Sequence, residues 1–407
     1  MLRVVRWGAV IALRCRRHGA MLATMRYHVV LLLAVVACSD ATQPMARPVS
    51  DTQAIAGASV PFATNVHTAS IPIPAGCIAM HLNNIAEVVG SCGGIFSPNT
   101  QSYAFKWQAD RGATYLTFQG DTANQAFGVN NKGEVVIGYG TGNTPRDVAI
   151  WDWYGNLTRR RRISPYSSAC QPNSGINDQG TIVGVCVLGP NNTTLSSVAT
   201  LWTPYGTPDG LHPGGGAGLV PPGVGMSISN TGYIAIQSYD PILAAYLFTP
   251  TLQLEPLASL KIANVNGMFV FGVNDLGQAV GAATVVGKSQ CNEYAVVWVT
   301  PDSVVNLGVC GAASAISDNG VVVGVGSLTD TSASFAFIWT ASGGLQRLPN
   351  LFGQSTVQSS SALKINANNQ ILGTLIVGST TVENPDTYTM LWTLLAPPAQ
   401  ITAKQLR

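Results

Sequence analysis

The sequence predicts an all-β fold, a seven-bladed β-propeller with four antiparallel strands in each blade. Three observations predict it. A hydrophobic residue followed by a polar turn and a short apolar run recurs seven times along the 407 residues. A tryptophan, replaced once by phenylalanine, follows each copy 20 to 27 residues later. The copies are 43 to 52 residues apart, close to the roughly 40 to 50 residues that are typical of a propeller blade.

The polar turn of each copy predicts a hairpin of two strands. In five copies a glycine stands four residues after the opening hydrophobic residue, and Ala86 and Asn369 take this place in the first and seventh copies. A hairpin loop of three residues needs a positive φ here, which glycine adopts freely and asparagine tolerates. The apolar runs that follow are short and β-branched, so they are predicted as strands. The opening residues are Leu82, Val129, Ile176, Ile228, Val273, Ile316 and Ile365.

The aromatic residue of each copy marks a third strand, and a short run that ends in leucine marks a fourth. An alanine stands three residues before the aromatic residue in five copies, Ala149 stands two residues before Trp151 in the second copy, and Thr389 stands three residues before Trp392 in the seventh. We expect the aromatic side chains to pack between neighbouring blades, and stacking against a bound sugar is the alternative for some of them. The residues are Trp107, Trp151, Trp202, Phe248, Trp298, Trp339 and Trp392.

A ring of blades needs a join between the two ends of the chain. Pro397 and Pro398 interrupt a fourth strand in the last copy, because proline cannot donate to a β-ladder. A strand-like segment, residues 60–73, precedes the first copy. We expect this segment to complete the seventh blade, which would remove the open sheet edges.

The N-terminal segment is typical of a targeting sequence. Residues 29–37 are an apolar run that is too short to span a bilayer but suits a signal peptide. The run ends directly before Cys38 and resembles a bacterial lipobox, which implies that this cysteine carries lipid; an ordinary signal peptide with an incidental cysteine is the alternative. The resemblance also implies an outer-membrane or cell-surface location, and otherwise a periplasmic or secreted one. The predicted division is a signal peptide with lipobox (1–38), a flexible tether (39–56), the propeller (57–399) and a C-terminal tail (400–407).

The charge balance depends on this leader. The chain has 21 Lys and Arg against 19 Asp and Glu, and six of the Arg but none of the acids precede Cys38. The mature chain would hold 15 basic and 19 acidic residues, a formal charge of −4. The excess of basic over acidic residues in the full chain therefore comes from the signal peptide, and nucleic acid is not an expected partner.

Six cysteines remain after Cys15 in the leader and the lipobox cysteine are set aside, and they fall into three close pairs. Each pair straddles a predicted hairpin turn, and residues opposite each other on antiparallel strands lie close enough for a disulfide. Such bonds fit an oxidising compartment. The expected disulfides are Cys77 with Cys92, Cys170 with Cys186 and Cys291 with Cys310.

The repeated unit resembles the HAF-repeat family of bacterial extracellular proteins. The resemblance rests on the strands AFKW (104–107) and AFIW (336–339) and on the hairpin pattern N-x-x-G-x-V-V-G, and it covers roughly residues 76–395. The fourth copy departs most, with Ile236 in place of the glycine that ends the run and Phe248 in place of tryptophan. The resemblance implies export and a repeat fold, and it carries no catalytic residues over to this chain.

Residues for acid-base or metal chemistry are scarce. Charged residues make up 10% of the chain, and the mature part has three histidines, His67, His81 and His212. The turn residues Asp178, Asp275 and Asp318 could suggest calcium, but Asx side chains commonly cap their own turns. We expect no cofactor, no metal and no catalytic constellation.

Four consecutive arginines are the sharpest charge feature of the chain: Arg159, Arg160, Arg161 and Arg162. They follow the second copy of the repeat. A solvated connection is one interpretation. The other is contact with an anionic partner such as lipid phosphate, acidic polysaccharide or protein carboxylates.

The function class predicted from these observations is a binding or interaction module, monomeric and anchored to the membrane by lipid, with a protein or glycan partner. Two alternatives stay open. Exposed aromatic pairs such as Trp151 and Trp153 would favour a glycan-binding protein. Clustered acids and histidines at the mouth of the channel would favour a secreted polysaccharide hydrolase or lyase.

Overall fold

A computed structural model describes fourteen segments of the chain: residues 60–93, 101–116, 123–140, 147–152, 154–160, 167–188, 196–204, 209–210, 222–239, 243–287, 291–329, 333–351, 357–378 and 386–395. The chain divides into two compact units, Met1–Ala54 and Ile55–Arg407, and every described residue belongs to the second. Several features predicted from the sequence lie outside the described residues: the signal peptide with Cys38, the tether, Trp153, Arg161, Arg162 and His212.

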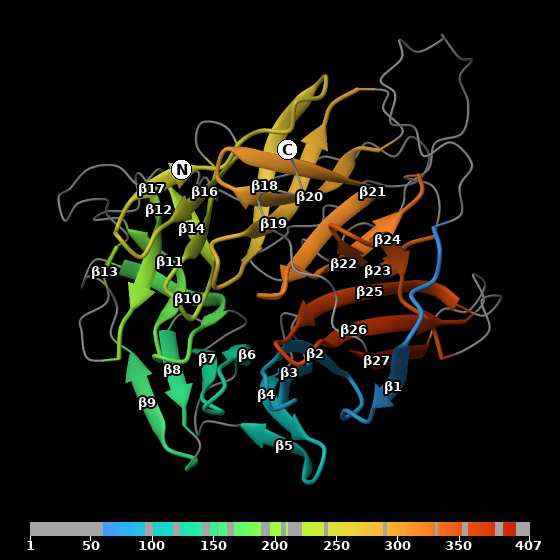
Figure 1. Ribbon diagram of the computed structural model, residues 1–407. Helices are drawn as coiled ribbons and strands as arrows, with labels where there is room; N and C mark the ends of the chain where they lie inside the picture. The colour runs from blue at the N-terminus through green and yellow to red at the C-terminus, as the bar shows by residue number, and fades with distance from the viewer. Residues whose placement is uncertain are drawn as a thin grey trace, which may run out of the picture. The chain divides into compact units, whose positions relative to one another are not determined.

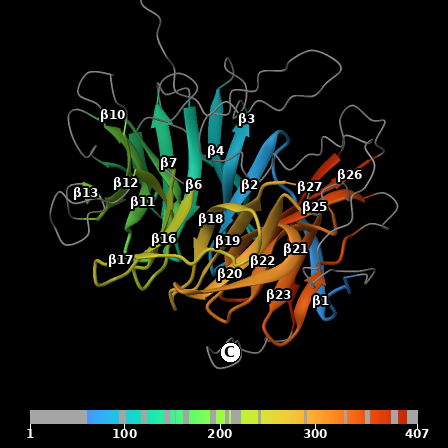
Figure 2. The ribbon, with the colours of Figure 1, turned by 90° about the horizontal axis from the view of Figure 1, so that it is seen from above.

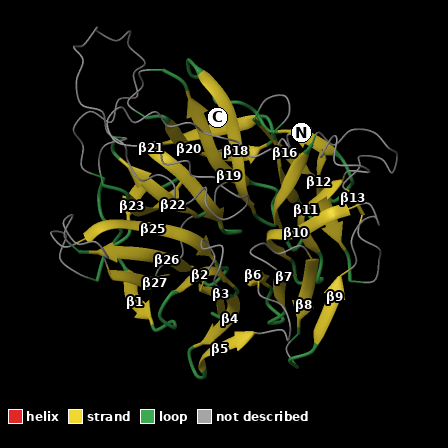
Figure 3. Cartoon of the chain, turned by 180° about the vertical axis from the view of Figure 1, so that it is seen from behind, coloured by secondary structure: helices red, strands yellow, loops and turns green. Residues whose placement is uncertain are grey.

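Every regular element in the described segments is a β-strand (Figure 3). The strands belong to five hydrogen-bonded sheets. Figure 1 shows these sheets following one another in chain order around a common centre, and Figure 2 shows them after a turn of 90°. The described segments contain no helix with the length and hydrophobicity needed to cross a membrane. The structure thus confirms an all-β propeller.

Three of the sheets have four antiparallel strands each. The first has β10 (Ser167–Ile176), β11 (Ile182–Leu188), β12 (Ser196–Trp202) and β13 (Asp209–Gly210). The second has β14 (Gly223–Ile228), β15 (Ile234–Ser238), β16 (Ala244–Phe248) and β17 (Leu254–Pro256). The third has β25 (Val357–Ile365), β26 (Gln370–Val377), β27 (Asp386–Leu394) and, from the beginning of the propeller, β1 (Val66–Ile71).

The two other sheets are larger because single links join consecutive repeats. In the seven-stranded sheet, β21 pairs with β20 through its first part and with β22 through its last part. In the eight-stranded sheet, one parallel pair, Ser102 with Ala123, joins β4 to β6. The seven-stranded sheet has β18 (Val265–Val273), β19 (Ala279–Val285), β20 (Glu293–Thr300), β21 (Ser303–Ile316), β22 (Val322–Ser327), β23 (Phe335–Thr340) and β24 (Gly344–Arg347). The eight-stranded sheet has β2 (Cys77–Leu82), β3 (Val88–Gly93), β4 (Ser102–Gln108), β5 (Gly112–Leu116), β6 (Ala123–Val129), β7 (Val135–Gly140), β8 (Asp147–Trp151) and β9 (Leu157–Arg160).

The N-terminal strand closes the ring as predicted. β1 pairs antiparallel with β27 over six residues, from Val66 opposite Leu394 to Ile71 opposite Thr389. The chain just before β1 also bonds to the end of β24, where the Ala63 N–H donates to the Arg347 carbonyl at 2.8 Å. The last sheet therefore takes three strands, β25 to β27, from the end of the propeller and its fourth strand, β1, from the beginning. This pairing joins the two ends of the propeller.

The hairpin turns have the backbone geometry that the repeat predicts. Gly133 has a φ of 75°, and the two residues that replace glycine, Ala86 and Asn369, have φ values of 61° and 58°. In the second turn the Gly133 N–H donates to the Asn130 carbonyl at 3.0 Å. A left-handed residue at this position lets the chain reverse direction within a short loop.

The recurrent aromatic residues form part of the core. Six of the seven are buried, and the indole N–H groups of Trp298 and Trp392 donate to the carbonyls of Ala258 and Pro349 at 2.7 and 2.6 Å. Trp151 is partly buried against a cluster of the second repeat. Core packing is therefore confirmed for the six buried side chains, whose burial also accounts for the spacing of the repeat.

Three disulfides join the cysteine pairs expected from the sequence. Cys77 lies opposite Cys92 in the ladder of β2 and β3, and Cys170 lies opposite Cys186 in that of β10 and β11. The third bond links Cys291, just before β20, to Cys310 on β21. Three such bonds fit an extracytoplasmic protein, because disulfides persist in oxidising compartments.

Candidate functional site

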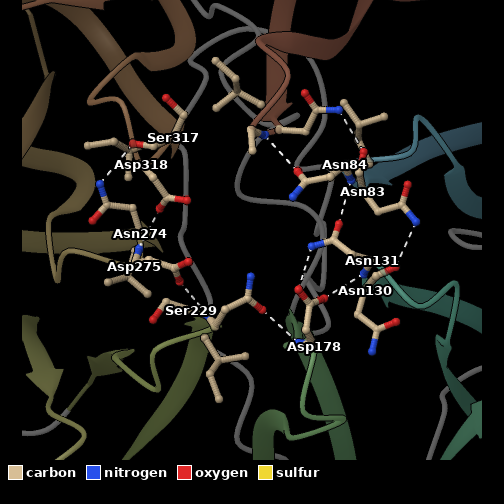
Figure 4. Close-up of a pocket in the computed structure, with 18 of the residues that line it drawn as sticks. Asn83, Asn84, Asn130, Asn131, Asp178, Ser229, Asn274, Asp275, Ser317 and Asp318 are labelled. Atoms are coloured by element: carbon tan, nitrogen blue, oxygen red, sulfur yellow. Dashed lines mark hydrogen bonds between the residues drawn. The ribbon is translucent and has the colours of Figure 1, made fainter. Parts of the chain in front are cut away.

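A cavity of about 190 Å³ lies where the hairpin turns of all the repeats meet (Figure 4). We call it the axial cavity. Its polar wall comes from the two residues that follow each opening hydrophobic residue, here the first-position and second-position residues. The first-position residues of the repeats are Asn83, Asn130, Asn177, Ser229, Asn274, Ser317 and Asn366. The second-position residues are Asn84, Asn131, Asp178, Asn230, Asp275, Asp318 and Ala367.

A first-position asparagine closes its own turn. The Oδ1 atom of Asn83 accepts hydrogen bonds from the N–H groups of Ile85 and Glu87 at 3.2 and 2.8 Å. Its Nδ2 atom donates to the Glu87 carboxylate at 2.8 Å. This side chain is the local acceptor that stabilises an Asx turn, which explains why five of the seven repeats have asparagine here.

The same side chain also binds the next repeat. The Nδ2 atom of Asn83 donates a second hydrogen bond to the carbonyl oxygen of Asn130, 47 residues later. The other four first-position asparagines form equivalent links. The distances are 2.9 Å from Asn83 to Asn130, 3.0 Å from Asn130 to Asn177, 3.3 Å from Asn177 to Ser229, 3.0 Å from Asn274 to Ser317 and 2.8 Å from Asn366 to Asn83.

The second-position residues form a parallel chain of links. The backbone N–H of one copy donates to the side-chain oxygen of the next, as Asn84 does to Asn131 at 2.8 Å. The bonds that continue it are Asn131 to Asp178 (2.8 Å), Asp178 to Asn230 (2.8 Å), Asn230 to Asp275 (2.6 Å), Asp275 to Asp318 (2.9 Å) and Ala367 to Asn84 (2.9 Å). Since every turn is described, six of the seven second-position N–H groups are paired in this way.

Both chains of links are interrupted between the sixth and seventh repeats. Ser317 has no side-chain N–H to donate forward, and Ala367 has no side-chain oxygen to accept the N–H of Asp318. Across these two described turns no hydrogen bond joins one to the other. The first chain of links is also broken at the other serine, Ser229, but the fourth and fifth turns remain joined, because the Thr231 hydroxyl donates to the neighbouring Asp275 carbonyl at 2.7 Å.

The wall of the axial cavity is acidic on one side. Both carboxylate oxygens of Asp178 accept hydrogen bonds from Asn131. In Asp275 and Asp318, by contrast, Oδ1 accepts backbone N–H groups, and Oδ2 accepts no hydrogen bond from the described residues. Burial raises the pKa of Asp318, and the negative charge of Asp275 raises it further, against a lowering by the Asp275 N–H. The cavity therefore offers acceptors for a ligand that donates hydrogen bonds.

Two side chains with basic groups lie near the join of the first and last repeats. Each stands one position before the opening hydrophobic residue of its repeat. His81 on β2 is buried, and burial together with the nearby Lys364 charge holds its pKa well below the usual value. Burial also lowers the pKa of Lys364, on β25, to about 8. No carboxylate of the described segments lies within 4 Å of this amine. The other five copies have small residues at this position: Gly128, Gly175, Ser227, Gly272 and Ala315.

Small residues are favoured at this position because the backbone here lies close to the next repeat. A Cβ on Gly175 would lie 3.0 Å from the Cγ2 atom of Ile228. The two large residues, His81 and Lys364, belong to the first and last repeats, whose turns are hydrogen-bonded to each other. Sequence analysis singled out His81 but missed Lys364, although aligning the seven copies would have shown it as an exception.

The one buried ion pair among the described residues is structural. The Lys106 Nζ atom lies 2.8 Å from the Glu87 Oε1 atom, which also accepts from Gln108 at 2.5 Å. The second carboxylate oxygen accepts from Asn83 at 2.8 Å. Because every strong acceptor of Glu87 is occupied, this carboxylate is not free to act as a base.

The remaining predicted site residues lie apart from the cavity. Arg159 is exposed on β9, and its guanidinium lies 5.2 Å from the centre of the Tyr139 ring. Arg160 ends the same strand. An anion contact at these arginines stays a prediction. His67 is exposed on β1, and in the described part of the chain no group of three or more His, Cys, Asp or Glu is placed to hold a metal.

Comparison with known proteins yields structural likeness alone. No family model matches the chain and no curated protein matches its sequence, so the resemblance to the HAF-repeat family stays a prediction. A chain of a mitotic checkpoint complex is similar, with a TM-score of 0.39 and 13% identity over 87% of this chain and 98% of that one. A gluconolactonase of Xanthomonas campestris has a TM-score of 0.35 and 12% identity, covering 80% and 98%. The sialidase of Trypanosoma rangeli has a TM-score of 0.34 and 10% identity, covering 80% and 55%. These values carry no conclusion on function.

Proposed function

We propose that this chain is an exported binding module of the bacterial cell envelope and that the axial cavity is its binding site. The observation that carries the proposal is the hydrogen-bonded wall of the cavity. Its side chains are held by bonds within and between the turns, yet Asp275 and Asp318 each keep one carboxylate oxygen that accepts from none of the described residues. A wall fixed before binding lowers the entropic cost of holding a ligand.

The chemistry of the wall selects the ligand class. Two carboxylates with available oxygens favour a ligand rich in hydrogen-bond donors, such as an ammonium, amide or hydroxyl group. A protein or glycan segment could supply these groups. Tyr154, in the turn between β8 and β9, is 86% exposed and offers a ring for stacking against a sugar, but it is not among the residues that line the axial cavity.

We propose binding rather than catalysis because of the hydrogen bonds and the ion pair in which the acidic side chains take part. Catalytic acids and bases need a partner group poised within hydrogen-bond reach of the substrate. In the described segments Glu87 is saturated by Lys106, Gln108 and Asn83, and Asp178 by Asn131. The two remaining cavity carboxylates are second-position residues that also accept backbone bonds, which suits a rigid receptor.

Anchoring at the envelope forms the second part of the proposal. The three disulfides support an extracytoplasmic location. The lipobox-like sequence before Cys38 supports attachment through lipid. A lipid anchor of this kind would keep the binding module at the cell envelope.

We further propose that each of the seven repeats is one blade. The turns of all seven line the same cavity, and each of the two larger sheets contains the strands of two repeats. In this interpretation β21 provides an outer strand to one blade and the inner strand to the next.

Calorimetry against hexosamine oligosaccharides, polyamines and short peptides tests the binding proposal. We expect a ligand whose affinity falls at least tenfold in the double variant Asp275→Asn and Asp318→Asn. Asp302→Asn, on an exposed turn between β20 and β21, is the matched control and should bind like the parent. Equal affinity of the double variant and the parent for every ligand found would contradict the proposed site. A hydrolytic activity lost in the same variant would show an enzyme instead.

A further inference from the structure

The interruption between the sixth and seventh turns leaves one hydrogen-bond donor and one acceptor without the partners that other repeats give them. The donor is the N–H of Asp318, whose six counterparts all donate to a side-chain oxygen of the next turn. The acceptor is the carbonyl of Asn366. It accepts the N–H of Asn369 at 3.1 Å, but it receives no side-chain amide from the sixth turn.

The missing groups are one side-chain N–H and one side-chain oxygen, which two different residues supply in other turns. Between the first and second turns, for comparison, Asn83 supplies an amide N–H and Asn131 supplies an amide oxygen. Ser317 and Ala367 supply neither. Both residues line the axial cavity, so a ligand in the cavity can reach the interruption.

We infer that the interruption between the sixth and seventh turns is a subsite for a primary carboxamide, the side chain of an asparagine or glutamine of a partner protein. The inference rests on the proposed function. The amide oxygen would accept the Asp318 N–H, and one amide N–H would donate to the Asn366 carbonyl. The second N–H would donate to a carboxylate oxygen that has no donor, that of Asp318 or Asp275.

A primary carboxamide fits this pattern better than other polar groups. It carries an acceptor and an N–H on the same edge, and a second N–H beside it. A trans secondary amide, as in a peptide bond or an N-acetyl sugar, points its N–H and its carbonyl in opposite directions. A carboxylate lacks the donor and would face the acidic side of the cavity.

Glycinamide is a suitable probe because it combines a primary carboxamide with a positive charge. Its control is glycine N-methylamide, which has the same charge but a secondary amide. The expected result is a saturable change in the NMR signal of the Asp318 amide with glycinamide, and at least tenfold weaker binding of the N-methyl compound. Equal binding of the two compounds, or no saturable change with glycinamide, would overturn the inference.

Substitutions test the same point from the protein side. Ala367→Asn supplies the missing oxygen from within the chain, and Ser317→Asn supplies the missing N–H. Each should weaken glycinamide binding at least tenfold, whereas Ala263→Asn, at an exposed site before β18, should leave it unchanged. Using two variants keeps the test valid if one fails to fold.

The outcomes separate this inference from the proposed function. Unchanged glycinamide affinity in both cavity variants would overturn the carboxamide subsite. If the double variant of Asp275 and Asp318 still loses another ligand, the axial cavity remains the binding site. Loss of glycinamide binding in both cavity variants, with the control unaffected, would support the subsite.

Discussion

The Nδ2 atom of Asn366 donates a hydrogen bond of 2.8 Å to the backbone carbonyl oxygen of Asn83, although the two residues are 283 positions apart in the chain. The same side chain donates to Gln370 at 2.8 Å and accepts the N–H groups of Asn368 and Gln370 at 3.0 and 2.9 Å. Asn366 therefore holds its own turn and joins the last repeat to the first. Together with the pairing of β1 and β27, it closes the ring at its centre and at its outer edge.

Replacing Asn366 by alanine should destabilise the propeller by about 1 to 3 kcal/mol. The side chain is buried, and its loss would leave partners in two turns without their hydrogen bonds. Urea unfolding, followed by tryptophan fluorescence, measures the change. Asn266→Ala, at an exposed position of β18, is the matched control and should lie within about 0.5 kcal/mol of the parent. An equal effect of the two variants would contradict the role given to Asn366.

Lys364→Met should stabilise the protein at neutral pH, by up to about 3 kcal/mol. The ammonium is partly buried without a carboxylate partner among the described residues, and a shift of its pKa from 10.5 to about 8 corresponds to a free energy of that order. Between pH 8 and pH 10.5 the unfolded state binds more protons at this site than the folded state. Stability of the parent should therefore rise with pH across this window, and the variant should lack that rise. A parent curve that falls or matches the variant would contradict this.

His81 should make the protein less stable in mild acid. Its pKa is held well below the ordinary value near 6.5, so the folded state keeps the imidazole neutral while the unfolded chain takes up a proton. The contribution is fully present above about pH 6.5 and is lost as the pH falls toward the folded-state pKa. Denaturant unfolding at pH 7.5 and pH 5.5 should show a smaller loss for His81→Gln than for the parent. His67→Gln, at an exposed residue of β1, serves as control and should retain the parent's loss.

Cys38→Ser should abolish lipid attachment. The hydroxyl cannot form the thioether through which a lipobox cysteine is modified, so the protein should accumulate as an unprocessed precursor or appear in soluble fractions. Fractionation of cells and mass spectrometry of the N-terminal peptide measure both results. Ser39→Ala is the neighbouring control and should still be lipidated. Normal processing and membrane association of the serine variant would contradict lipidation at Cys38.

The architecture could be predicted from the sequence because each repeat forms its strands from residues that are close together in the chain. The positive φ positions of Ala86 and Asn369, the burial of Trp298 and the closing strand at 66–71 all follow from spacing and residue type. The five hydrogen-bonded sheets do not follow. They depend on how far β21 extends past its own hairpin, which is a matter of register between repeats.

The turn residues that form the candidate site could be recognised in the sequence, but the hydrogen bonds between neighbouring turns could not. The sequence predicts that Asp178, Asp275 and Asp318 cap their own turns, but their carboxylates accept from the preceding turn. The first-position asparagines cap the turns instead, as Asn83 does in a contact over four residues. That the same Asn83 amide reaches a carbonyl 47 residues later depends on neighbouring turns lying side by side, and no local pattern shows this. The exceptions, Ala367 and Lys364, become visible only when the seven copies are aligned position by position.

Amide hydrogen exchange at the seven second-position residues measures the hydrogen-bonded wall and its interruption most directly. The N–H groups of Asn84, Asn131, Asp178, Asn230, Asp275 and Ala367 each donate to a neighbouring side chain and should exchange slowly. The N–H of Asp318 has no such acceptor in the part of the chain that the structure describes, and it should exchange at least tenfold faster than that of Asp275. Ala367→Asn should slow it to the range of the other six. Protection of Asp318 equal to that of Asp275 in the parent would contradict the open link on which the proposed subsite depends.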